Sequence, residues 1–339
     1  EMTSSLVGSE MCIRDRLYRW SLRMTIPVFY TISDNYTPYA AVSIQSLIDH
    51  VDPNKDYTIT LLVQSISDEH KKSLENLSTE NVHVNIFHID DEMVAPIHNS
   101  EENYLRAQFF TMSIFYRLFI PNLFPQYDKA VYLDADTIIC TDIAELYNTE
   151  IGDNMFASVP DMSIRFIKPL QVYIKECQGI FPPEKYINNG VILFNMKEFR
   201  DKKFVDKFYS LIEKYHFDNI DPDQAYMNEI CEDKIYHLPL EWDAMPNEHM
   251  DEIKDPKIVH YNLFFKPWHF ADVQYGQYFW DVAKKSPYYY ELKEQLDSFT
   301  DEDRKKARAD LDWMIKKVDE IKNEDVTWAK VKKTTSVKI

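Results

Sequence analysis

Glycine is scarce in this chain of 339 residues, which has only five, at positions 8, 152, 179, 190 and 276. No two of them form a G-x-G pair, and none belongs to a G-x-x-x-x-G-K motif. Rossmann-type dinucleotide sites and P-loops need such glycines to bring backbone amides close to a phosphate. The sequence therefore excludes both kinds of site, and a bound phosphate must be held by side chains or a metal ion.

Other shortages narrow the class of protein further. The four cysteines form no C-x-x-C pair and no zinc-ligand spacing, which favours reduced thiols in a cytoplasmic protein. No run of 18 apolar residues is present, so no membrane-spanning helix is expected. Lysine and arginine number 38 against 56 acidic residues, which gives a net charge of −18. Such a chain repels nucleic acid, and we expect no nucleic-acid partner.

The pattern of the first half is that of an α/β protein. Hydrophobic residues make up 45% of the chain, enough for a large core. Strands alternate with helices, which predicts a mainly parallel sheet covered by helices. The strands are expected over 26–32, 57–63, 82–87 and around 131–139, and the helices over 37–50, 67–77 and 103–118.

The second half is less regular. Strands are expected over 156–159, 190–195 and 257–260, a helix over 196–215, and a shorter helix from about 223 with Asp221 as its cap. From 299 onward the chain is charged and helical, with one apolar stripe at Leu311, Met314, Val318 and Ile321. The tail after 325 carries four lysines and no acid. It is interpreted as a frayed basic end, with peripheral membrane contact as the alternative.

Residues 1–22 are set apart from the fold. The segment 6–16 resembles a translated sequencing-adapter peptide, and it lacks the apolar centre of a signal peptide. We expect this leader to be non-native.

The most informative motif is a pair of carboxylates, Asp134 and Asp136, directly after the apolar run 131–133. The run indicates a buried strand, so the pair lies where that strand opens into a loop. Open α/β sheets bind ligands at this carboxyl end. Two carboxylates this close repel each other unless a cation lies between them. The pair therefore indicates a divalent metal and, with it, a phosphate ligand.

His260 and Lys266 give a second signal. His260 ends a short β-rich segment, and Lys266 follows six residues later. Two carboxylates and one imidazole suit Mn²⁺ better than Mg²⁺, which prefers oxygen ligands, although Mg²⁺ stays an alternative. Lys266 is then expected near a metal-bound phosphate.

Amide side chains give a third signal. Asn188 and Asn189 precede Gly190, which gives a ligand room for close approach at the mouth of a strand. Amides and carboxylates of this kind recognise sugar hydroxyls. Capping of the following helix explains Asp221, but it does not explain Gln224.

Taken together, these segments resemble the retaining family-eight glycosyltransferases, the group that contains glycogenin and bacterial lipo-oligosaccharide galactosyltransferases and glucosyltransferases. The resemblance covers about residues 26–270 in order. Its segments are 33–36 (SDNY), 115–118 (FYRL), 132–139 (YLDADTII), 186–195 (YINNGVILFN), 221–224 (DPDQ) and 260–268 (HYNLFFKPW). Any one of these motifs is weak, but six in order are specific.

The resemblance implies a nucleotide-sugar domain of the GT-A type over 23–275, with a mixed, mainly parallel sheet, and a C-terminal helical extension with a basic tail over 276–339. It implies a UDP-hexose donor and a glycan or lipid-linked sugar acceptor. Asp134, Asp136 and His260 match the metal ligands. Lys266 matches the lysine that contacts the diphosphate. The matched donor positions are Thr31, Ser33, Asn35 and Tyr36 in the uridine loop, Ala135 near the ribose, Arg117 at the donor sugar, and Asp161, Asn188, Asp223 and Gln224 around the transferred hexose. Asn189, which replaces a commoner small residue of the family, and Trp268 are further expected substrate-binding residues.

The implied reaction is transfer of glucose or galactose to an acceptor hydroxyl of a bacterial cell-surface glycan, with retention at the anomeric carbon. The family match places a neutral amide, Gln224, where a carboxylate nucleophile is usual, which favours front-face attack over a covalent intermediate. In one departure from some relatives, Leu263 stands where they have a glycine beside the diphosphate. The expected location is cytoplasmic, with membrane association through the tail as an extension of it.

Two other functions stay open on the sequence. The segment 133–138 also resembles the signature of haloacid-dehalogenase-like phosphatases, in which the first aspartate is the nucleophile. That fold would place the motif on its first strand and would need a later Gly-Asp-Gly-x-x-Asp cluster, which the chain lacks. The second alternative is a degenerate domain that binds a UDP-sugar without transferring it.

Overall fold

The computed structural model describes residues 25–89 and 112–339. The expected leader 1–22 and residues 103–111 of the expected helix 103–118 lie outside these ranges. The strands are β1 (Thr25–Thr31), β2 (Asp56–Val63), β3 (Val82–His88), β4 (Lys129–Leu133), β5 (Thr137–Ile139), β6 (Phe156–Ser158), β7 (Val191–Asn195), β8 (Ile235–His237) and β9 (Ile258–His260).

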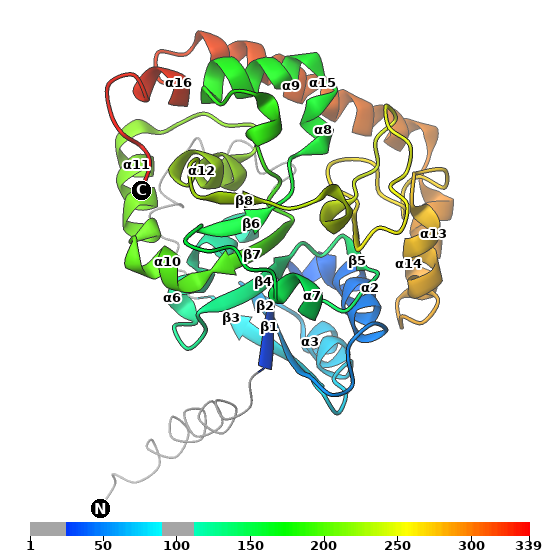
Figure 1. The fold of residues 1–339 in the computed structure, drawn as a ribbon. Coiled ribbons are helices and arrows are strands. Elements are labelled where there is room, and N and C mark those ends of the chain that lie inside the picture. The colour runs from blue at the N-terminus through cyan, green and yellow to red at the C-terminus, as the bar shows by residue number, and fades with distance from the viewer. Residues whose placement is uncertain (1–24, 90–111) are drawn as a thin grey trace, which may run out of the picture.

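Helices connect and cover these strands (Figure 1). The α-helices are α2 (Thr37–Ile48), α3 (Asp68–Glu75), α6 (Ile120–Leu123), α7 (Ala144–Tyr147), α8 (Met162–Arg165), α9 (Lys168–Val172), α10 (Met196–Asp201), α11 (Phe204–Tyr215), α12 (Pro222–Ile230), α13 (Gly276–Ala283), α14 (Tyr289–Ser298), α15 (Asp301–Asn323) and α16 (Trp328–Val331). The shorter turns are η1 (Asp34–Tyr36), η2 (Met112–Phe119), η3 (Tyr173–Gln178), η4 (Pro183–Lys185) and η5 (Leu240–Asp243).

The main sheet has seven strands in the order β3-β2-β1-β4-β7-β6-β8. β7 runs antiparallel to both of its neighbours, and the other four pairs are parallel. The prediction of a mixed, mainly parallel sheet is therefore confirmed. Because β1, β2, β3 and β4 all run in the same direction, their carboxyl ends lie at one edge of the sheet, which is where ligands bind in such sheets.

Both faces of the sheet are covered, and β4 supplies the two cores alternately. On β4, Ala130 and Tyr132 belong to one core, while Val131 and Leu133 belong to the other. This alternation follows from the pleat, which points successive side chains to opposite faces. Figure 1 shows α10 and α11 on one side of the sheet and α2 and α3 on the other.

A second, two-stranded sheet controls the position of the candidate site. β5 follows the two aspartates closely, and it pairs antiparallel with β9 so that Thr137 lies opposite His260. The backbone N–H of Tyr261 donates to the carbonyl oxygen of Asp136 over 3.0 Å. Segments more than 120 positions apart in the sequence are thereby fixed side by side.

One predicted helix, 196–215, is wrong as a continuous element. The structure divides it into α10 and α11 at Lys203, whose φ of 54° lies in the left-handed region. In an unbroken helix, Phe199 and Phe204 would point to different faces. The break lets both rings enter the core, where their centroids lie 4.7 Å apart.

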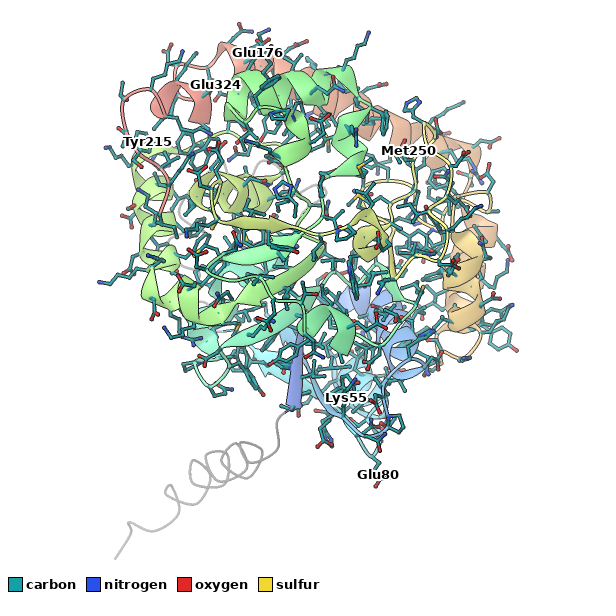
Figure 2. All side chains as sticks on the ribbon, in the orientation of Figure 1. Lys55, Glu80, Glu176, Tyr215, Met250 and Glu324 are labelled. Atoms are coloured by element: carbon teal, nitrogen blue, oxygen red, sulfur yellow. The ribbon has the colours of Figure 1, made fainter. Side chains whose placement is uncertain are left out.

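The C-terminal helices pack against the rest of the chain. Met314, Val318 and Ile321 of the predicted apolar stripe of α15 are buried. Lys322 of α15 forms an ion pair with Glu176 of η3, with 2.7 Å between Nζ and Oε2. Figure 2 shows Glu176 and Glu324 at the same end of the molecule. Within the described part of the chain, each helix is too short or too polar to cross a membrane.

The prediction of a frayed basic end is wrong. Trp328 of α16 is buried and stacks on Phe217, with 3.7 Å between the ring centroids. Lys332 pairs with the buried Glu229 of α12 over 2.6 Å, and Lys338 pairs with Asp233 over 2.9 Å. The lysines that looked like a free cationic tail instead attach that tail to an acidic surface.

Candidate functional site

A cavity of about 690 Å³ opens at the carboxyl ends of β1 and β4. All of the site residues expected from the sequence line it. They are Thr31, Ser33, Asn35, Tyr36, Arg117, Asp134, Ala135, Asp136, Asp161, Asn188, Asn189, Asp223, Gln224, His260, Lys266 and Trp268. We divide them into two groups: the β4 end (Asp134, Asp136, His260 and Lys266) and the α12 end (Asp161, Asn188, Asn189, Asp223 and Gln224).

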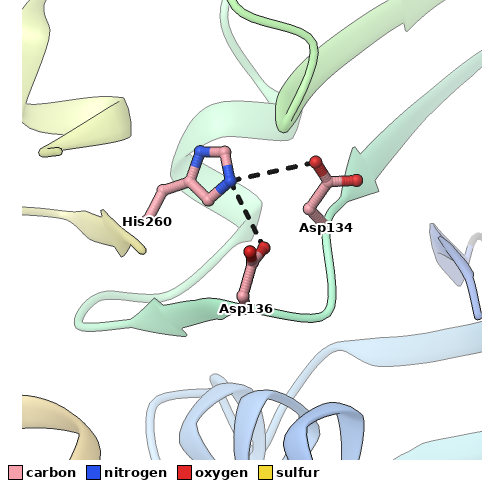
Figure 3. A group of neighbouring side chains, drawn as sticks. All are labelled: Asp134, Asp136 and His260. Atoms are coloured by element: carbon pink, nitrogen blue, oxygen red, sulfur yellow. Dashed lines mark ion pairs between the residues drawn. The ribbon is translucent and has the colours of Figure 1, made fainter. Parts of the chain in front are cut away.

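The β4 end is built by the two sheets together. Asp134 follows β4 directly, and its N–H donates to the carbonyl oxygen of Gly190 over 2.8 Å. The pairing of β5 with β9 then carries His260 toward both aspartates (Figure 3). His260 Nε2 lies 3.3 Å from Asp136 Oδ1 and 3.8 Å from Asp134 Oδ2.

The His260 ring is held from behind. Its Nδ1 lies 3.0 Å from Oδ1 of the buried Asp243, which leaves Nε2 facing the aspartate pair. Burial lowers the pKa of His260, but the charges of Asp243 and Asp136 outweigh burial and raise it to about 10. Gly190 gives the ring its space, because a Cβ there would lie 2.0 Å from His260 Cε1.

These three side chains fit a metal ion. One ligand atom from each of Asp134, Asp136 and His260 lies within 4.8 Å of the others. A carboxylate behind the imidazole, as Asp243 provides, is the usual way to fix the orientation of a metal-binding histidine. The residues can therefore hold a divalent cation with two hard oxygen ligands and one nitrogen ligand.

Lys266 adds a fixed positive charge beside this group. Its Nζ contacts the carboxylate of Asp136 and the carbonyl oxygen of Tyr261, and the side chain is buried. Burial raises the pKa of Asp136, but the charges of Lys266 and His260 outweigh burial and hold that pKa below its usual range. Asp136 is thus an anion in this setting. Nearby, Trp268 stacks on Tyr39 with 4.0 Å between the ring centroids.

Arg117, in η2, joins the two ends of the cavity. Its Nη2 lies 3.0 Å from Asp134 Oδ1, and its Nε lies 3.1 Å from Asp223 Oδ2. Its Nη1 also donates to the backbone oxygen of Asn189 over 2.6 Å. A single buried guanidinium therefore fixes the distance between the acid that follows β4 and the acid that begins α12.

The α12 end is a network of amides and carboxylates. Asn188 Nδ2 and Gln224 Nε2 both donate to Asp161 Oδ2, over 3.2 and 3.0 Å. Asn189 Nδ2 donates to Asp223 Oδ2 over 3.2 Å, while Asn189 Oδ1 is buried and has no hydrogen-bond partner among the described residues. Burial raises the pKa of Asp223, and Arg117 opposes that shift. The unpaired Asn189 oxygen is suited to a hydroxyl of a ligand.

Asp161 is engaged more fully than the sequence suggested. Besides the two amides, it caps α8 through its Oδ1, which accepts from the N–H groups of Ser163 and Ile164 over 2.9 and 3.3 Å. Asp161 therefore holds other side chains in place, in addition to lining the cavity.

The interpretation of Asp221 as a helix cap is wrong. It occupies the N-cap position of α12, but its carboxylate accepts no backbone hydrogen bond from that helix. Instead, Oδ1 accepts from Tyr173 over 2.8 Å, and Oδ2 accepts from Tyr186 and from Gln224 Nε2, the latter over 3.1 Å. Asp221 also lines the cavity, so sequence reasoning missed a site residue here.

The end of β1 and the turn after it also line the cavity. Thr31 Oγ1 lies 2.8 Å from the Tyr132 hydroxyl, which in turn donates to Asp134 Oδ1 over 2.7 Å. Ser33 donates to Asn35 Oδ1 over 2.5 Å, which closes the turn. Tyr36 packs edge-on against Tyr39, with 5.3 Å between the ring centroids.

Leu263 has the backbone conformation of a glycine. Its φ is 54°, a region that a leucine rarely adopts. Strain of this kind persists only where the surroundings impose it, and it gathers at binding sites. The position that some relatives fill with glycine therefore keeps the glycine-like turn in this chain.

Helix α15 supplies a wall that the sequence did not indicate. Asp303, Lys306, Ala307 and Met314 line the cavity together with the preceding Phe299, which stacks on His269 with 4.3 Å between the ring centroids. The apolar stripe predicted that α15 packs on the domain. Only the fold shows that its first half lies over the cavity.

Comparison with known proteins places this geometry in context. A sequence profile described as Glycosyl transferase family 8 matches residues 27–272. The chain is 27% identical over 287 residues to a lipopolysaccharide 1,2-glucosyltransferase of Escherichia coli, covering 78% of this chain and 80% of that protein. It is 22% identical over 254 residues to general stress protein A of Bacillus subtilis, covering 69% and 84%.

Solved structures show the same architecture. The bifunctional glycosyltransferase WbbM in its apo form has a TM-score of 0.67 and 26% identity, covering 81% of this chain and 52% of that one. This chain thus spans about half of WbbM. The galactosyltransferase LgtC, in complex with donor and acceptor sugar analogs, has a TM-score of 0.63 and 21% identity, covering 77% and 96%. These likenesses confirm the expected GT-A type of fold.

Proposed function

Because this chain belongs to glycosyl transferase family 8, we propose that it is a metal-dependent, retaining hexosyltransferase that moves glucose or galactose from a UDP-sugar to a glycan hydroxyl. One observation carries the proposal. Asp134, Asp136 and His260 lie together at the carboxyl end of β4, in a cavity that is also lined by amide and carboxylate side chains suited to sugar hydroxyls. The phosphatase alternative is wrong, because its motif would lie on the first strand and here follows β4.

The β4 end suits a diphosphate. We propose that Asp134, Asp136 and His260 hold Mn²⁺, with Mg²⁺ as the alternative, and that the bound ion supplies positive charge for a leaving UDP. Lys266 provides a second cation, already in place beside Asp136. Fixed charges of this kind stabilise a leaving group without reorganisation during the reaction.

The turn after β1 suits the nucleoside. We propose that Thr31, Ser33, Asn35 and Tyr36 contact the uridine and that the backbone at Ala135 lies near the ribose. All of them line the same cavity. Trp268 then closes the diphosphate region through its stack on Tyr39.

The α12 end suits the transferred hexose. Asn188, Asn189 and Asp223 offer acceptors and donors to its hydroxyls, and Arg117 supports Asp223. Gln224 is a neutral amide and a poor nucleophile, so we propose front-face attack. The bond from the anomeric carbon to the UDP oxygen breaks, the bond to the acceptor oxygen forms on the same face, and the acceptor proton passes to the departing phosphate oxygen.

The acceptor proposed is a cell-surface glycan or a lipid-linked sugar, following the lipopolysaccharide 1,2-glucosyltransferase of Escherichia coli. The location proposed is cytoplasmic. Peripheral membrane contact through the tail stays a prediction. Two of the tail lysines, Lys332 and Lys338, form ion pairs with Glu229 and Asp233.

The test is a donor screen with the purified chain. UDP-glucose, UDP-galactose and UDP-N-acetylglucosamine are each incubated with Mn²⁺, and UDP release is followed with and without EDTA. We expect release from one hexose donor that stops with EDTA, and NMR of the product should show the donor's anomeric configuration. UDP release that is unchanged by EDTA, or a product with inverted anomeric configuration, would contradict the proposal. UDP binding without any release would favour the degenerate binding domain.

A further inference from the structure

The Asp221 carboxylate is surrounded by donors. Tyr173, at the start of η3, donates to Oδ1, while Tyr186 and Gln224 Nε2 donate to Oδ2. The two tyrosine rings are fully buried. An ionised carboxylate has acceptor sites for all three bonds. Burial raises the pKa of Asp221 to about 7, so the ionised form prevails at pH 8. Asp221 is therefore the acceptor in a fixed cradle formed by Tyr173, Tyr186 and Gln224. Its carboxylate takes no part in capping α12.

The Gln224 amide has one orientation in this setting. Its Nε2 faces two carboxylates, Asp161 at 3.0 Å and Asp221 at 3.1 Å. Its Oε1 accepts from the backbone N–H of Asn189 over 3.1 Å. Turning the amide over would place its oxygen against two anions and its NH₂ against an N–H donor. Both N–H bonds are therefore occupied, and only a lone pair of Oε1 is left for a ligand.

We propose that Asp221 is a positioning residue that locks the Gln224 amide so that it offers the cavity an acceptor oxygen and no donor. The proposal deepens the proposed function on which it rests, because it states which polar atom of Gln224 is offered to the transferred hexose. An amide locked this way accepts from a sugar hydroxyl or places partial negative charge beside the ring. A freely turning amide would do so only part of the time.

The C-terminal segment contacts the cradle through Asn219. Trp328 Nε1 donates to Asn219 Oδ1 over 2.9 Å, and the Tyr173 hydroxyl lies 3.4 Å from the same oxygen. Asn219 is two residues before Asp221. Trp328 lies outside the family-matched residues 27–272, so this support comes from the chain's own C-terminal part.

The main experiment compares Asp221→Asn with the parent protein at pH 8, using UDP-glucose and UDP-galactose with Mn²⁺. The substitution keeps the shape and offers an NH₂ where an acceptor is needed. We expect kcat to fall roughly 10- to 10²-fold, the usual result of a misplaced catalytic group. The affinity for UDP with Mn²⁺, measured by calorimetry, should change less than about twofold, because the β4 end is untouched.

A double-mutant cycle separates positioning from a general loss of structure. In a Gln224→Ala background the amide is gone, so Asp221→Asn should lower kcat less than about twofold further. A fall of the same factor in both backgrounds would overturn the proposal, as would an unchanged kcat in the single variant.

A second variant covers the case in which Asp221→Asn does not fold. Tyr173→Phe removes one donor from the cradle, and its effect on kcat should be smaller and should also vanish in the Gln224→Ala background. Tyr215→Phe is the matched control, because its hydroxyl contacts Thr335, at 3.4 Å, and Lys214, and none of the cradle residues. Equal effects of the two phenylalanine variants would contradict the proposal.

A crystal structure separates failure of this inference from failure of the proposed function. If the parent protein transfers no hexose, the proposed function fails, but the structure of Asp221→Asn or Tyr173→Phe still decides the positioning. We expect the Gln224 side chain to leave its bonds with Asp161 and Asn189. An unmoved side chain in the variant would overturn the inference whatever the substrate.

Discussion

The two ends of the cavity differ in how their buried charged and polar side chains are paired. At the β4 end, Asp134 and Asp136 are balanced by Lys266, Arg117 and His260, and Asp134 stays a quarter exposed. At the α12 end, most amides and carboxylates hydrogen-bond one another inside the protein, and Asn189 Oδ1 is left for a ligand. The first arrangement leaves charge to be completed by a ligand, whereas the second fixes side chains before any ligand arrives. Substitutions at the β4 end should therefore change both UDP–metal binding and turnover, whereas substitutions at the α12 end should change turnover and leave UDP binding nearly unchanged.

The largest effect is expected for Asp136→Asn at the β4 end. Loss of one carboxylate removes a metal ligand and the partner of Lys266, so turnover should fall on the order of 10³-fold. UDP release from the donor is the measurement. Asp128→Asn is the control, because this exposed residue just before β4 pairs with Arg200, and it should keep full activity. Full activity of Asp136→Asn would remove the metal assignment.

Lys266→Ala comes next. The variant loses one fixed cation but keeps the three candidate metal ligands, so turnover should fall roughly 10²-fold, which corresponds to about 2.7 kcal/mol as for an oxyanion donor. Steady-state kinetics with saturating Mn²⁺ measure this. Lys285→Ala, which removes an exposed lysine paired with Asp49, serves as the matched control. Equal rates for the two variants would mean that Lys266 is only structural.

Gly190→Ala tests the space at the junction of the two ends. The added methyl group would lie 2.0 Å from His260 Cε1, so the imidazole must move. Displacing an oriented ligand typically weakens metal binding roughly 10- to 10²-fold. A Mn²⁺ titration in the presence of UDP reports this. In the control Gly276→Ala the new Cβ meets Val273 at an ordinary 3.4 Å, and the titration should be unchanged.

The smallest expected effect is on stability, and it comes from the buried Glu229 near the C-terminal end of α12. Burial raises the pKa of Glu229 to about 8, against the charge of Lys332. The unfolded carboxyl ionises near 4.5, so between pH 5 and 8 unfolding releases a proton and stability falls as pH rises. The stabilisation from protonated Glu229 is fully present below the unfolded-state pKa of 4.5, and it is lost as the pH rises through the folded-state pKa of about 8. Its slope is roughly 1 kcal/mol per pH unit.

Glu229→Gln should remove this slope, which urea unfolding at several pH values would reveal. Glu232→Gln is the control, since that carboxylate pairs with the same Lys332 but is partly exposed. Identical slopes in the parent protein and in Glu229→Gln would show that Glu229 is ionised in the folded state throughout.

The β4 end could be predicted because its signals are local. Asp134 and Asp136 stand at fixed spacing after an apolar strand, and the direction of a parallel sheet places that strand end at a ligand site. The closeness of His260 was implied only by the family resemblance, because it depends on the register of β5 with β9. No property of either segment alone specifies that pairing.

The residues that were missed depend on distant packing. An aspartate before a proline most often caps a helix, so Asp221 gave no sign of its bonds to Tyr173 and Tyr186. The cover of α15 over the cavity and the docking of Trp328 join parts of the chain far apart in sequence. Periodicity predicts that such a helix packs, but it does not say against what.

Calorimetry with UDP and Mn²⁺ tests the central claim most directly, namely that Asp134, Asp136 and His260 hold a cation that in turn binds the diphosphate. Linkage requires each ligand to strengthen the other by the same factor. We expect Mn²⁺ to tighten UDP binding roughly tenfold or more, and UDP to tighten Mn²⁺ binding equally, with both effects lost in Asp136→Asn. Equal UDP affinity with and without Mn²⁺ in the parent protein would contradict the account.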